Sequence, residues 1–553
     1  MTNDEIADVL KMYAQLYELH GGNPFKIKSY NAAVFRIDKF PVPLSGKTEE
    51  ELAQIDGIGK SLAEKIAQID ERGTFTDLDD LISETPEGVF QMLRIKGLGP
   101  KKVQVIWKEL GIESVGELLY ACHENRLAQA KGFGQKTQES VVKSIEFAAA
   151  SAGKFHYAAV EELAHTLLKS LQQFPFVLSA ALTGEVRRKS EIINAVEFVL
   201  ATDDSTDAIQ KLSACDLFHE VAIDRNILTA KWNEVPVKIH LTSEQEYIYH
   251  LWQTTGVEAH NTQLNVAVKN YSSEEEIYNS HQLDYIVPEL REGTKEIELA
   301  KSHSLPRLVE VSDLKGTLHN HSTYSDGSNT LEQMALECIK RSYEYLGICD
   351  HSKSAQYAGG LKEDRIIAQH NEIDVLNKKL GPFKIFKGIE SDILNDGSLD
   401  YTADVLSSFD FVVASVHSNL KMNEEKAMGR LLKAIENPYT TILGHPTGRL
   451  LLIREGYPVD HKKMIDACAA NGVIIELNAH PYRLDMDWRW ISYALDKGVK
   501  ISINPDAHNT AGFSDMYYGV CVARKGFLTA DMCFNALTQN EISAYFAQRK
   551  AGK

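Results

Sequence analysis

The stretch "TLHNHSTYSDG" (Thr317–Gly327) decides the fold of the second half, because it places His319 and His321 two residues apart, with Asp326 shortly after. It follows the apolar–polar run "VEVSDLKG", so we expect the histidines at the end of a β-strand. Side chains at positions i and i+2 of a strand point to the same face. Two imidazoles on one face make one side of a metal site, and other strands must supply the rest.

Six further short apolar runs follow, separated by amphipathic stretches such as "TLEQMALECIKR". This alternation predicts parallel βα units, and seven of them predict a distorted (βα)7 barrel. Six of the seven runs end at or near a His, Asp or Glu that we assign to the predicted cluster, and the sixth ends in Asn478 and His480. The carboxyl ends of barrel strands meet at one mouth. The predicted cluster is His319, His321, Asp326, His351, Glu390, His417, His445, Asp506 and His508.

The composition of this cluster predicts its chemistry. A mixture of His, Asp and Glu suits Mn, Zn or Fe, not calcium. Nine ligands exceed what one ion takes, so two or three divalent ions are predicted. Close multi-metal sites hydrolyse phosphate esters, because the ions activate water and neutralise phosphate oxygens. Arg449 in "GHPTGR" and Arg483 in "HPYRLD" are candidate bidentate phosphate-binding residues, with a surface salt bridge as the alternative for each.

The motif series "LHNHSTYSDGS", "CDHS", "GIESDI", "SVHS", "GHPTGR" and "PDAH" resembles that of the polymerase and histidinol phosphatase (PHP) domain, over about residues 310–550. The resemblance implies a trinuclear site formed by the same nine residues, with Glu390 bridging two ions. The catalytic set that we assign is His319, His321, Glu390 and Asp506. One departure is Thr317, where the family usually has Asp in "GDLH". The resemblance implies that this Asp lies outside the metal ligands, so we expect metal binding to be retained and the properties of the bound metal to differ.

Length and composition limit the other possibilities. A chain of 553 residues is too long for one hydrophobic core, so several domains are expected. The N-terminus is acidic and amphipathic, unlike a signal peptide, and no apolar run reaches the ~18 residues of a membrane span. Seven cysteines without a CxxC pair predict a reducing, cytoplasmic location. A formal charge of −18 means that any nucleic-acid surface must be local. A monomer is favoured, although no pattern determines the oligomeric state.

Three segments of the first half share a G-x-G turn before a helix start: "IDGIGKSLAEKI" (55–66), "IKGLGPKKVQVI" (95–106) and "AKGFGQKTQESV" (130–141). They resemble the helix-hairpin-helix motif, whose backbone N–H groups face a DNA phosphate without reading bases. The alternative is that each G-x-G ends a helix as a C-cap. The predicted DNA-binding residues are Gly57, Gly59, Lys60, Gly97, Gly99, Lys101, Lys102, Gly132 and Gly134.

The segment "HGGNPFKIKSYNAAVFRI" (20–37), followed by these hairpins, resembles the N-terminal domain of bacterial family X DNA polymerases, which carry a PHP domain at the C-terminus. "TGVEAHN" (255–261) and "YIVPELRE" (285–292) resemble their thumb. The resemblance covers essentially the whole chain. The implied domains are an N-terminal helical domain (1–80), a fingers-like helical domain (81–155), an α+β nucleotidyltransferase-like palm (156–242), a thumb (243–300) and the PHP domain (310–553).

The palm departs from the family pattern of Gly-Ser, an Arg pair, Asp-x-Asp and a third Asp. The glycine and arginines are present as Gly184, Arg187 and Arg188. The serine and the three aspartates are replaced by Glu185, Ala195, Glu197 and Lys238. Nucleotidyl transfer needs two Mg²⁺ ions held by carboxylates, so Mg²⁺ in the palm is not expected and the palm is predicted not to polymerise. The arginine pair either binds a DNA phosphate or consists of solvated strand residues.

The sequence therefore predicts a metal-dependent DNA phosphodiesterase, acting as a 3'-5' exonuclease or at abasic sites. Its predicted partner is DNA with gaps, nicks or single-strand ends, and the resemblance implies that Mn²⁺ supports the nuclease. Three alternatives stay open: an active gap-filling polymerase, a non-catalytic DNA-binding scaffold, and a small-molecule phosphatase.

Overall fold

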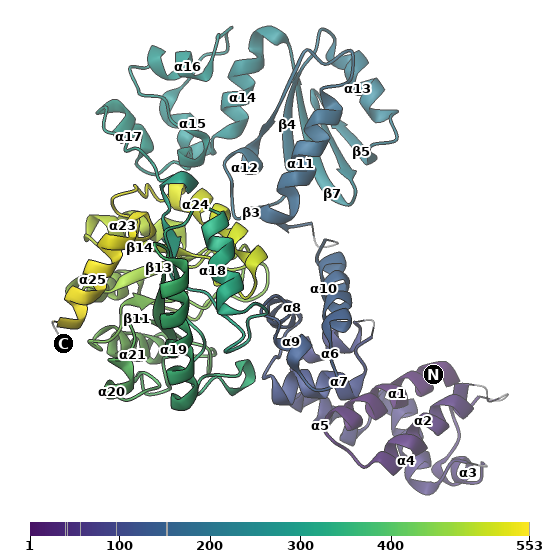
Figure 1. Cartoon of the computed structure of the whole chain (residues 1–553). Helices are drawn as coiled ribbons and strands as arrows, with labels where there is room; N and C mark the ends of the chain where they lie inside the picture. Colours follow the sequence, from purple (N-terminus) through teal and green to yellow (C-terminus); the bar gives the residue numbers. More distant parts are fainter. Residues whose placement is uncertain (39, 41–42, 56, 96, 151–152, 552–553) are drawn as a thin grey trace. The chain divides into compact units, whose positions relative to one another are not determined.

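The computed structural model describes all residues except 39, 41–42, 56, 96, 151–152 and 552–553 (Figure 1). Two compact units are present, Met1–Ile145 and Glu146–Lys553. The division lies near the predicted boundary at 155, and the predicted domain limits within each unit stay predictions. None of the described helices is both long and apolar enough to cross a membrane.

The first unit is helical. Side-chain capping boxes at Thr2, Thr48 and Ser114 start three of its helices by satisfying their first free N–H groups. Helix α1 packs against α2, α5 and α7 around buried aliphatic side chains. The elements are α1 (Asn3–Leu19), α2 (Pro24–Asp38), α3 (Glu49–Ala53), α4 (Lys60–Arg72), α5 (Thr76–Glu84), α6 (Glu87–Leu93), α7 (Pro100–Gln104), a π-helical turn (Val105–Glu109), α8 (Val115–His123), α9 (Arg126–Gln129) and α10 (Gln135–Ala150), which runs into the second unit.

The second unit begins with a five-stranded sheet in the order β2-β4-β7-β6-β5. Only the β4–β7 pair of this sheet is parallel. Strand β7 alternates buried and half-buried residues, as expected for a sheet covered on one face. The elements are β1 (Phe155–His156), α11 (Tyr157–Leu171), β2 (Ser179–Thr183), α12 (Gly184–Arg187), β3 (Ile192–Ile193), β4 (Val196–Ala201), α13 (Ser205–Ser213), β5 (His219–Asp224), β6 (Ile227–Trp232) and β7 (Val235–Thr242).

A helical segment connects this sheet to the barrel. Its core, around Trp252 and Tyr278, also takes in Leu308 and Phe527 of the C-terminal region, so the segment shares apolar contacts with the barrel domain. The elements are a 3-10 turn (Glu244–Glu246), α14 (Tyr247–Thr255), α15 (Glu258–Leu264), α16 (Glu274–Ser280), a 3-10 turn (Pro288–Leu290) and α17 (Glu296–Lys301).

Seven parallel strands form the C-terminal sheet, in the order β14-β13-β12-β11-β10-β9-β8. Its two edges approach each other, because His321 N donates to Ala507 O (2.9 Å) and Leu318 N donates to the Asn504 side chain (3.0 Å). The predicted distorted (βα)7 barrel is thus confirmed as a nearly closed barrel. The strands are β8 (Gly316–Thr317), β9 (Tyr345–Ile348), β10 (Lys384–Asp392), β11 (Phe411–Ser415), β12 (Ile442–Leu443), β13 (Ile474–Asn478) and β14 (Ile501–Asn504).

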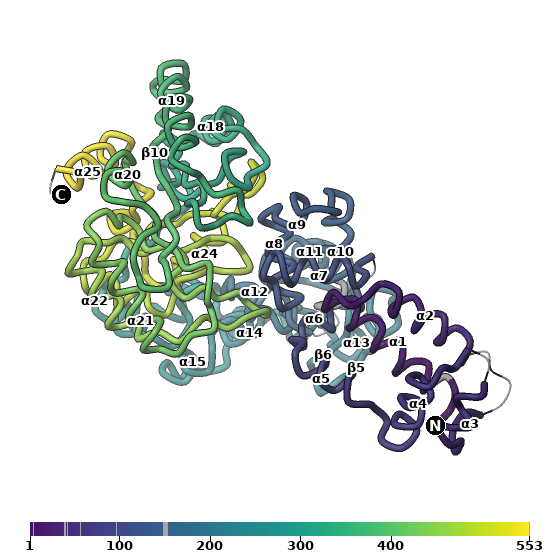
Figure 2. The backbone as a smooth tube through the Cα atoms, turned by 90° about the horizontal axis from the view of Figure 1, so that it is seen from below, coloured from purple at the N-terminus to yellow at the C-terminus, as the bar shows by residue number. Residues whose placement is uncertain are grey.

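Helices surround the barrel strands, which are buried along nearly their whole length, as expected for a parallel sheet. Helices α18 and α19 lie side by side (Figure 2) and pack on one shared apolar core. The helices are α18 (Leu331–Lys340), α19 (Glu363–Leu380), α20 (Ala403–Leu406), α21 (Glu424–Ile435), α22 (His461–Asn471), α23 (Ile491–Asp496), α24 (Met516–Lys525) and α25 (Gln539–Ala551). The 3-10 turns are Val311–Asp313, Gln356–Ala358, Trp488–Trp490, Thr510–Asp515 and Phe534–Ala536.

Candidate metal centre and nucleic-acid surfaces

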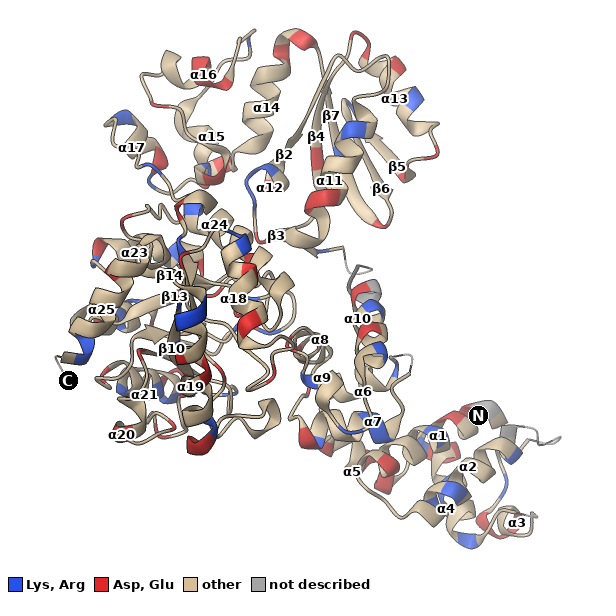
Figure 3. Ribbon diagram, viewed as in Figure 1, with Lys and Arg blue, Asp and Glu red and all other residues tan. Residues whose placement is uncertain are grey.

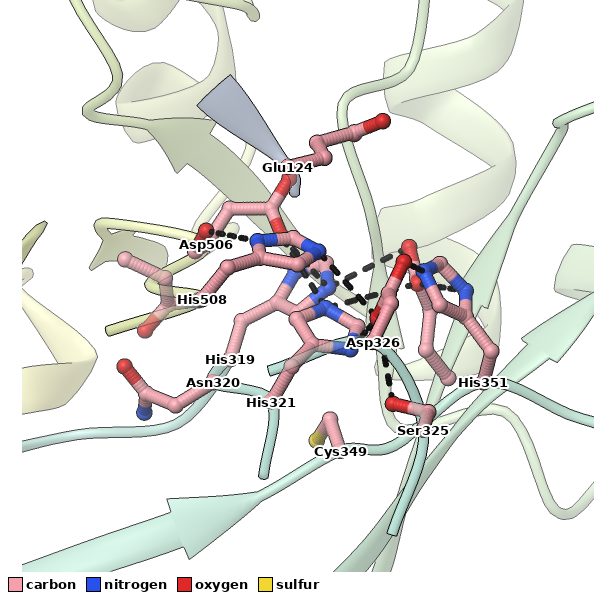
Figure 4. Close-up of polar contacts among 12 residues, drawn as sticks. Glu124, His319, Asn320, His321, Ser325, Asp326, Cys349, His351, Asp506 and His508 are labelled. Carbon is pink, nitrogen blue, oxygen red and sulfur yellow. Dashed lines mark hydrogen bonds and ion pairs between the residues drawn. The ribbon is translucent and has the colours of Figure 1, made fainter. Parts of the chain in front are cut away.

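The nine residues predicted to form a cluster do come together, at the carboxyl ends of the barrel strands. Figure 4 shows six of them, namely His319, His321, Asp326, His351, Asp506 and His508. Glu390 lies on β10, and the others follow β8, β9, β11, β12 and β14. All are buried or nearly so; His319, His321 and Asp326 have no exposed surface. The structure therefore places six imidazoles and three carboxylates in one interior site.

Three groups within the cluster have ligand atoms close enough to share an ion, each group lying within 4.8 Å. His321 and His351 each belong to two groups, so the three positions adjoin. His445 approaches the same site through Nε2, which lies 3.0 Å from Glu390 Oε1. The groups are His321–Asp326–His351–His508, His319–His321–Asp506 and His351–Glu390–His417.

The donor atoms fit a divalent metal. His319 Nε2, His351 Nδ1 and Glu390 Oε2 are buried and make no hydrogen bond within the part of the chain that the structure describes. They nevertheless face one another, with His319 Nε2 3.2 Å from Glu390 Oε1 and His351 Nδ1 2.9 Å from Glu390 Oε2. Burying polar atoms without hydrogen bonds costs about 1–3 kcal/mol each. A shared cation would satisfy all of them.

The electrostatics favour ionised carboxylates in this site. Burial alone would raise the pKa of Glu390, but the surrounding His417, His319 and His351 hold it well below its usual value. The pKa values of Asp326 and Asp506 are likewise held well below the usual range by neighbouring histidines, against the effect of burial. Deprotonated carboxylates are the form that binds a metal.

Outer carboxylates orient two of the histidines, and sequence analysis missed them. Glu476 is fully buried on β13; its Oε1 lies 2.7 Å from His319 Nδ1, and its Oε2 accepts from His445 N at 2.8 Å. Asp392 Oδ1 lies 2.6 Å from His417 Nδ1. Metal-binding histidines usually bond such partners through the second ring nitrogen. The available signal was a glutamate inside the apolar run "VIIELN".

Arg483 and Arg449 have different environments. Arg483 is buried, with Nε 3.9 Å from Asp506 Oδ2 at the edge of the cluster. Arg449 instead donates to backbone oxygens of Arg483 (3.0 Å) and Leu484 and to the Asp487 carboxylate (2.6 Å). The guanidinium of Arg449 thus supports the loop that carries Arg483, and phosphate binding by Arg449 stays a prediction.

Thr317 is buried and accepts a hydrogen bond from Asn320 Nδ2 (3.2 Å). Neither residue belongs to the three groups of ligand atoms. The departure from the family pattern at this position therefore leaves those groups complete.

The replaced palm residues form an internal ion pair. Lys238 lies beside Glu197 on the neighbouring strand, with Nζ 3.4 Å from Glu197 Oε2. His240 Nε2 lies 2.9 Å from the same oxygen. Ala195 immediately precedes β4. Among the residues described for 156–242, no trio of His, Cys, Asp or Glu lies close enough to share an ion.

Arg187 and Arg188 are not solvated strand residues, because both lie at α12 and both bond internal partners; binding of a DNA phosphate by the pair stays a prediction. Arg187 bonds both oxygens of Glu274, at 2.9 and 2.5 Å. Arg188 bonds Glu292 (3.1 Å) and the Thr255 carbonyl (2.6 Å). Both arginines thus contact residues of the helical segment that follows the sheet. Gly184 begins α12 with a left-handed φ of +60°, and Glu185 is held by two hydrogen bonds from Asn194.

The three hairpins have one geometry. Gly57, Gly97 and Gly132 take left-handed φ values of +87°, +91° and +86°. In each hairpin, the next residue's N–H bonds the carbonyl three residues earlier, at 2.9–3.1 Å. The second glycine, Gly59 or Gly99, starts α4 or α7 without any side-chain cap. The C-cap alternative is not supported, because the helices before the three hairpins have their C-caps at Gln54, Arg94 and Ala130. Positions 56 and 96 of these motifs lie outside the described residues.

The glycines of the hairpins are mostly unobstructed, and lysine side chains lie near them. A side-chain carbon added at Gly59, Gly97, Gly99, Gly132 or Gly134 would meet no other atom within 4 Å. Lys60 and Lys101 are exposed near the starts of α4 and α7. Figure 3 colours the basic segments of the helical unit blue. Lys102 is more engaged, since Nζ donates to Gly97 O (3.1 Å). The exposed N–H groups and lysines form a surface that suits a phosphate.

Together, a nearly closed parallel barrel with a buried His/Asp/Glu cluster and a helical region with three Gly-x-Gly hairpins define a PHP-domain protein with helix-hairpin-helix modules. Residues 1–75 match a helix-hairpin-helix domain, residues 90–146 a SAM-like helix-hairpin-helix tandem and residues 317–480 the PHP domain. The "DNA polymerase/3'-5' exonuclease PolX" of Bacillus subtilis (strain 168) is 33% identical over 570 residues, which cover 99% of each chain. The chain belongs to the PolX family.

The barrel also resembles shorter proteins. A "Probable phosphatase" of Thermoanaerobacter sp. (strain X514) is 26% identical over 243 residues, covering 42% of this chain and 94% of the relative. A "Probable phosphatase" of Acetivibrio thermocellus is 28% identical over 200 residues, covering 34% of this chain and 78% of the relative. The PHP part of the chain is therefore similar to proteins that lack the helical and palm regions.

Proposed function

We propose that this chain is a metal-dependent DNA phosphodiesterase, acting as a 3'-5' exonuclease or at abasic sites through its barrel cluster. The observation that carries the proposal is the convergence of nine His, Asp and Glu side chains on one buried site. The name of the Bacillus subtilis relative includes a 3'-5' exonuclease. The hairpins and that relative support DNA with gaps, nicks or single-strand ends as the substrate.

Two or three Mn, Zn or Fe ions would be held by His319, His321, Asp326, His351, Glu390, His417, His445, Asp506 and His508. Bound there, the ions supply Lewis acidity that activates water and neutralises phosphate oxygens. Glu476 keeps the His319 ring oriented through Nδ1, so that Nε2 faces Glu390. Arg483, whose Nε lies 3.9 Å from Asp506 Oδ2, would hold a phosphate oxygen.

The palm serves as a scaffold in this proposal. Polymerisation requires carboxylates free to hold Mg²⁺, whereas the Glu197 carboxylate contacts Lys238 and His240. A cytoplasmic location is supported by the seven cysteines, all of which are free thiols. A monomer is proposed from the sequence alone.

A single gel tests this function. The full-length protein is incubated with a 5'-labelled primer on a gapped template, Mn²⁺ and all four nucleotides. We expect the primer to shorten, and the rate to fall about 10²–10³-fold in His319→Ala, because that substitution removes a donor of the cluster. His303→Ala, at an exposed histidine, is the matched control. Primer lengthening would overturn the palm proposal, and no shortening would overturn the nuclease.

Removal of hairpin charge should weaken DNA binding without changing sequence preference. For Lys60→Ala and Lys101→Ala we expect the slope of log K against log salt to fall in magnitude by about one each, since each substitution loses one phosphate contact. Fluorescence anisotropy with two unrelated duplexes over a salt series measures this slope. Lys378→Ala, an exposed site on α19, should leave the slope unchanged. Unchanged slopes in the hairpin variants would contradict phosphate binding there.

A further inference from the structure

Asp350 is a buried carboxylate outside the nine-residue cluster that makes an unusual number of hydrogen bonds. It immediately precedes His351 and has no exposed surface. Its Oδ1 accepts from Ser322 N (2.8 Å), Ser325 N (3.1 Å) and Ser325 Oγ (2.5 Å). Its Oδ2 accepts from Ser322 Oγ and Gln369 Nε2, both at 2.6 Å. These five donors occupy the carboxylate, so its lone pairs are directed to the protein and away from an ion.

Four of the five donors belong to the turn that carries Asp326. Ser322 follows His321, and Ser325 precedes Asp326. The Ser325 hydroxyl, which bonds Asp350, also lies 3.2 Å from Asp326 Oδ1. Figure 4 shows Ser325 beside Asp326. Gly327 closes the turn, because a side-chain carbon there would lie 2.8 Å from the His321 carbonyl group. The turn that carries Asp326 is therefore bonded directly to Asp350.

Helix α19 holds the same turn from the outside. Gln369 donates to Asp350, Arg365 donates to the Tyr324 carbonyl, and Glu372 accepts from the Tyr324 hydroxyl (2.8 Å). Residues 365, 369 and 372 lie on one face of a helix. We call Asp350, Ser325 and Gln369 the Asp326 brace.

We infer that the Asp326 brace positions Asp326 as a ligand of one ion, the ion held by His321, Asp326, His351 and His508. The inference rests on the proposed metal centre and adds positioning residues outside its ligands. Asp326 belongs to that group and to neither of the other two. Weakening the brace should therefore lower the affinity of one metal position and spare the others.

The experiment measures Mn²⁺ binding to the full-length protein, by titration calorimetry together with the number of ions bound at each step. Asp326→Ala first identifies which binding step depends on Asp326. In Ser325→Ala, Gln369→Met and Asp350→Asn we expect the same step to weaken about 10–100-fold, as is typical for groups that orient metal ligands. The melting temperature of each metal-free variant shows whether folding is retained. If Asp350→Asn does not fold, the two milder variants decide the question.

Asn371→Met is the matched control, because Asn371 is an exposed amide on the same helix. It should leave every binding step unchanged. The inference is overturned if folded brace variants bind Mn²⁺ as the native protein does, or if they weaken all steps equally. A native protein that binds no Mn²⁺ would overturn the metal centre itself, a result distinct from either outcome for the variants.

Discussion

Glu390→Gln should lower the rate of DNA cleavage by about a thousandfold or more and reduce the number of bound ions. Glu390 is the carboxylate on which the cluster converges. Its Oε1 lies 3.0–3.2 Å from nitrogen atoms of three histidines, namely His319, His417 and His445. The substitution preserves the size of the side chain but removes the negative charge that these imidazoles surround. Loss of an outer partner typically costs 10–100-fold, so loss of the central ligand should cost more.

Cleavage kinetics at saturating Mn²⁺, combined with metal analysis of the dialysed protein, provide the measurement. Glu425→Gln, an exposed carboxylate at the start of α21, is the control and should retain the native rate and metal content. A Glu390→Gln protein with its full complement of ions and a rate within tenfold of native would contradict the role of Glu390 in holding metal. Such a result would leave the barrel cluster without its central carboxylate ligand.

The barrel cluster could be predicted from the sequence because most of the strands are followed closely by a His, Asp or Glu. A short apolar run that ends in His, Asp or Glu indicates a strand and, at its carboxyl end, a residue at the mouth of the barrel. The parallel βα order then brings the carboxyl ends of all the strands together.

The residues that the sequence did not identify depend on long-range contacts. Glu476 bonds His319 across 157 residues of chain, and nothing local to "VIIELN" indicates that partner. Arg449 lies in a motif beside His445, yet folding places its guanidinium on the loop that contains Arg483 and Asp487. An arginine's neighbours in sequence say little about which carboxylate its long side chain reaches.

Substitution of Glu274, the carboxylate that Arg187 of the palm contacts, should lower the stability of the folded chain strongly. Arg291 is fully buried, and its Nη1 lies 2.5 Å from Glu274 Oε1, while Arg187 bonds both Glu274 oxygens. Glu274→Gln leaves the Arg291 charge buried without its carboxylate. Breaking a buried pair in this way costs about 3–5 kcal/mol. We therefore expect the free energy of opening of α16, measured by hydrogen exchange at pH 7, to fall by about 3–5 kcal/mol.

The contribution of the Glu274 carboxylate to stability should decrease at low pH. Burial alone would raise the pKa of Glu274, but Arg187 and Arg291 hold it below its ordinary 4.5. A carboxyl with a depressed pKa stabilises the folded state above the unfolded pKa, and that contribution disappears as pH falls through the folded value. The difference between the native protein and Glu274→Gln should therefore be full above about pH 5 and shrink at lower pH. Glu275→Gln, its exposed neighbour, should show no such difference.

The same measurement bears on the palm. If Arg187 is to bind a DNA phosphate, one of the two interpretations of the sequence, it must leave Glu274. A loss of 3–5 kcal/mol in Glu274→Gln would mean that this ion pair is part of the core, which favours the palm as a scaffold for the nuclease. A loss below about 1 kcal/mol, the range of an exposed pair, would mean that Arg187 is released at little cost. The gap-filling polymerase would then become the better account of residues 156–242, even with Lys238 beside Glu197.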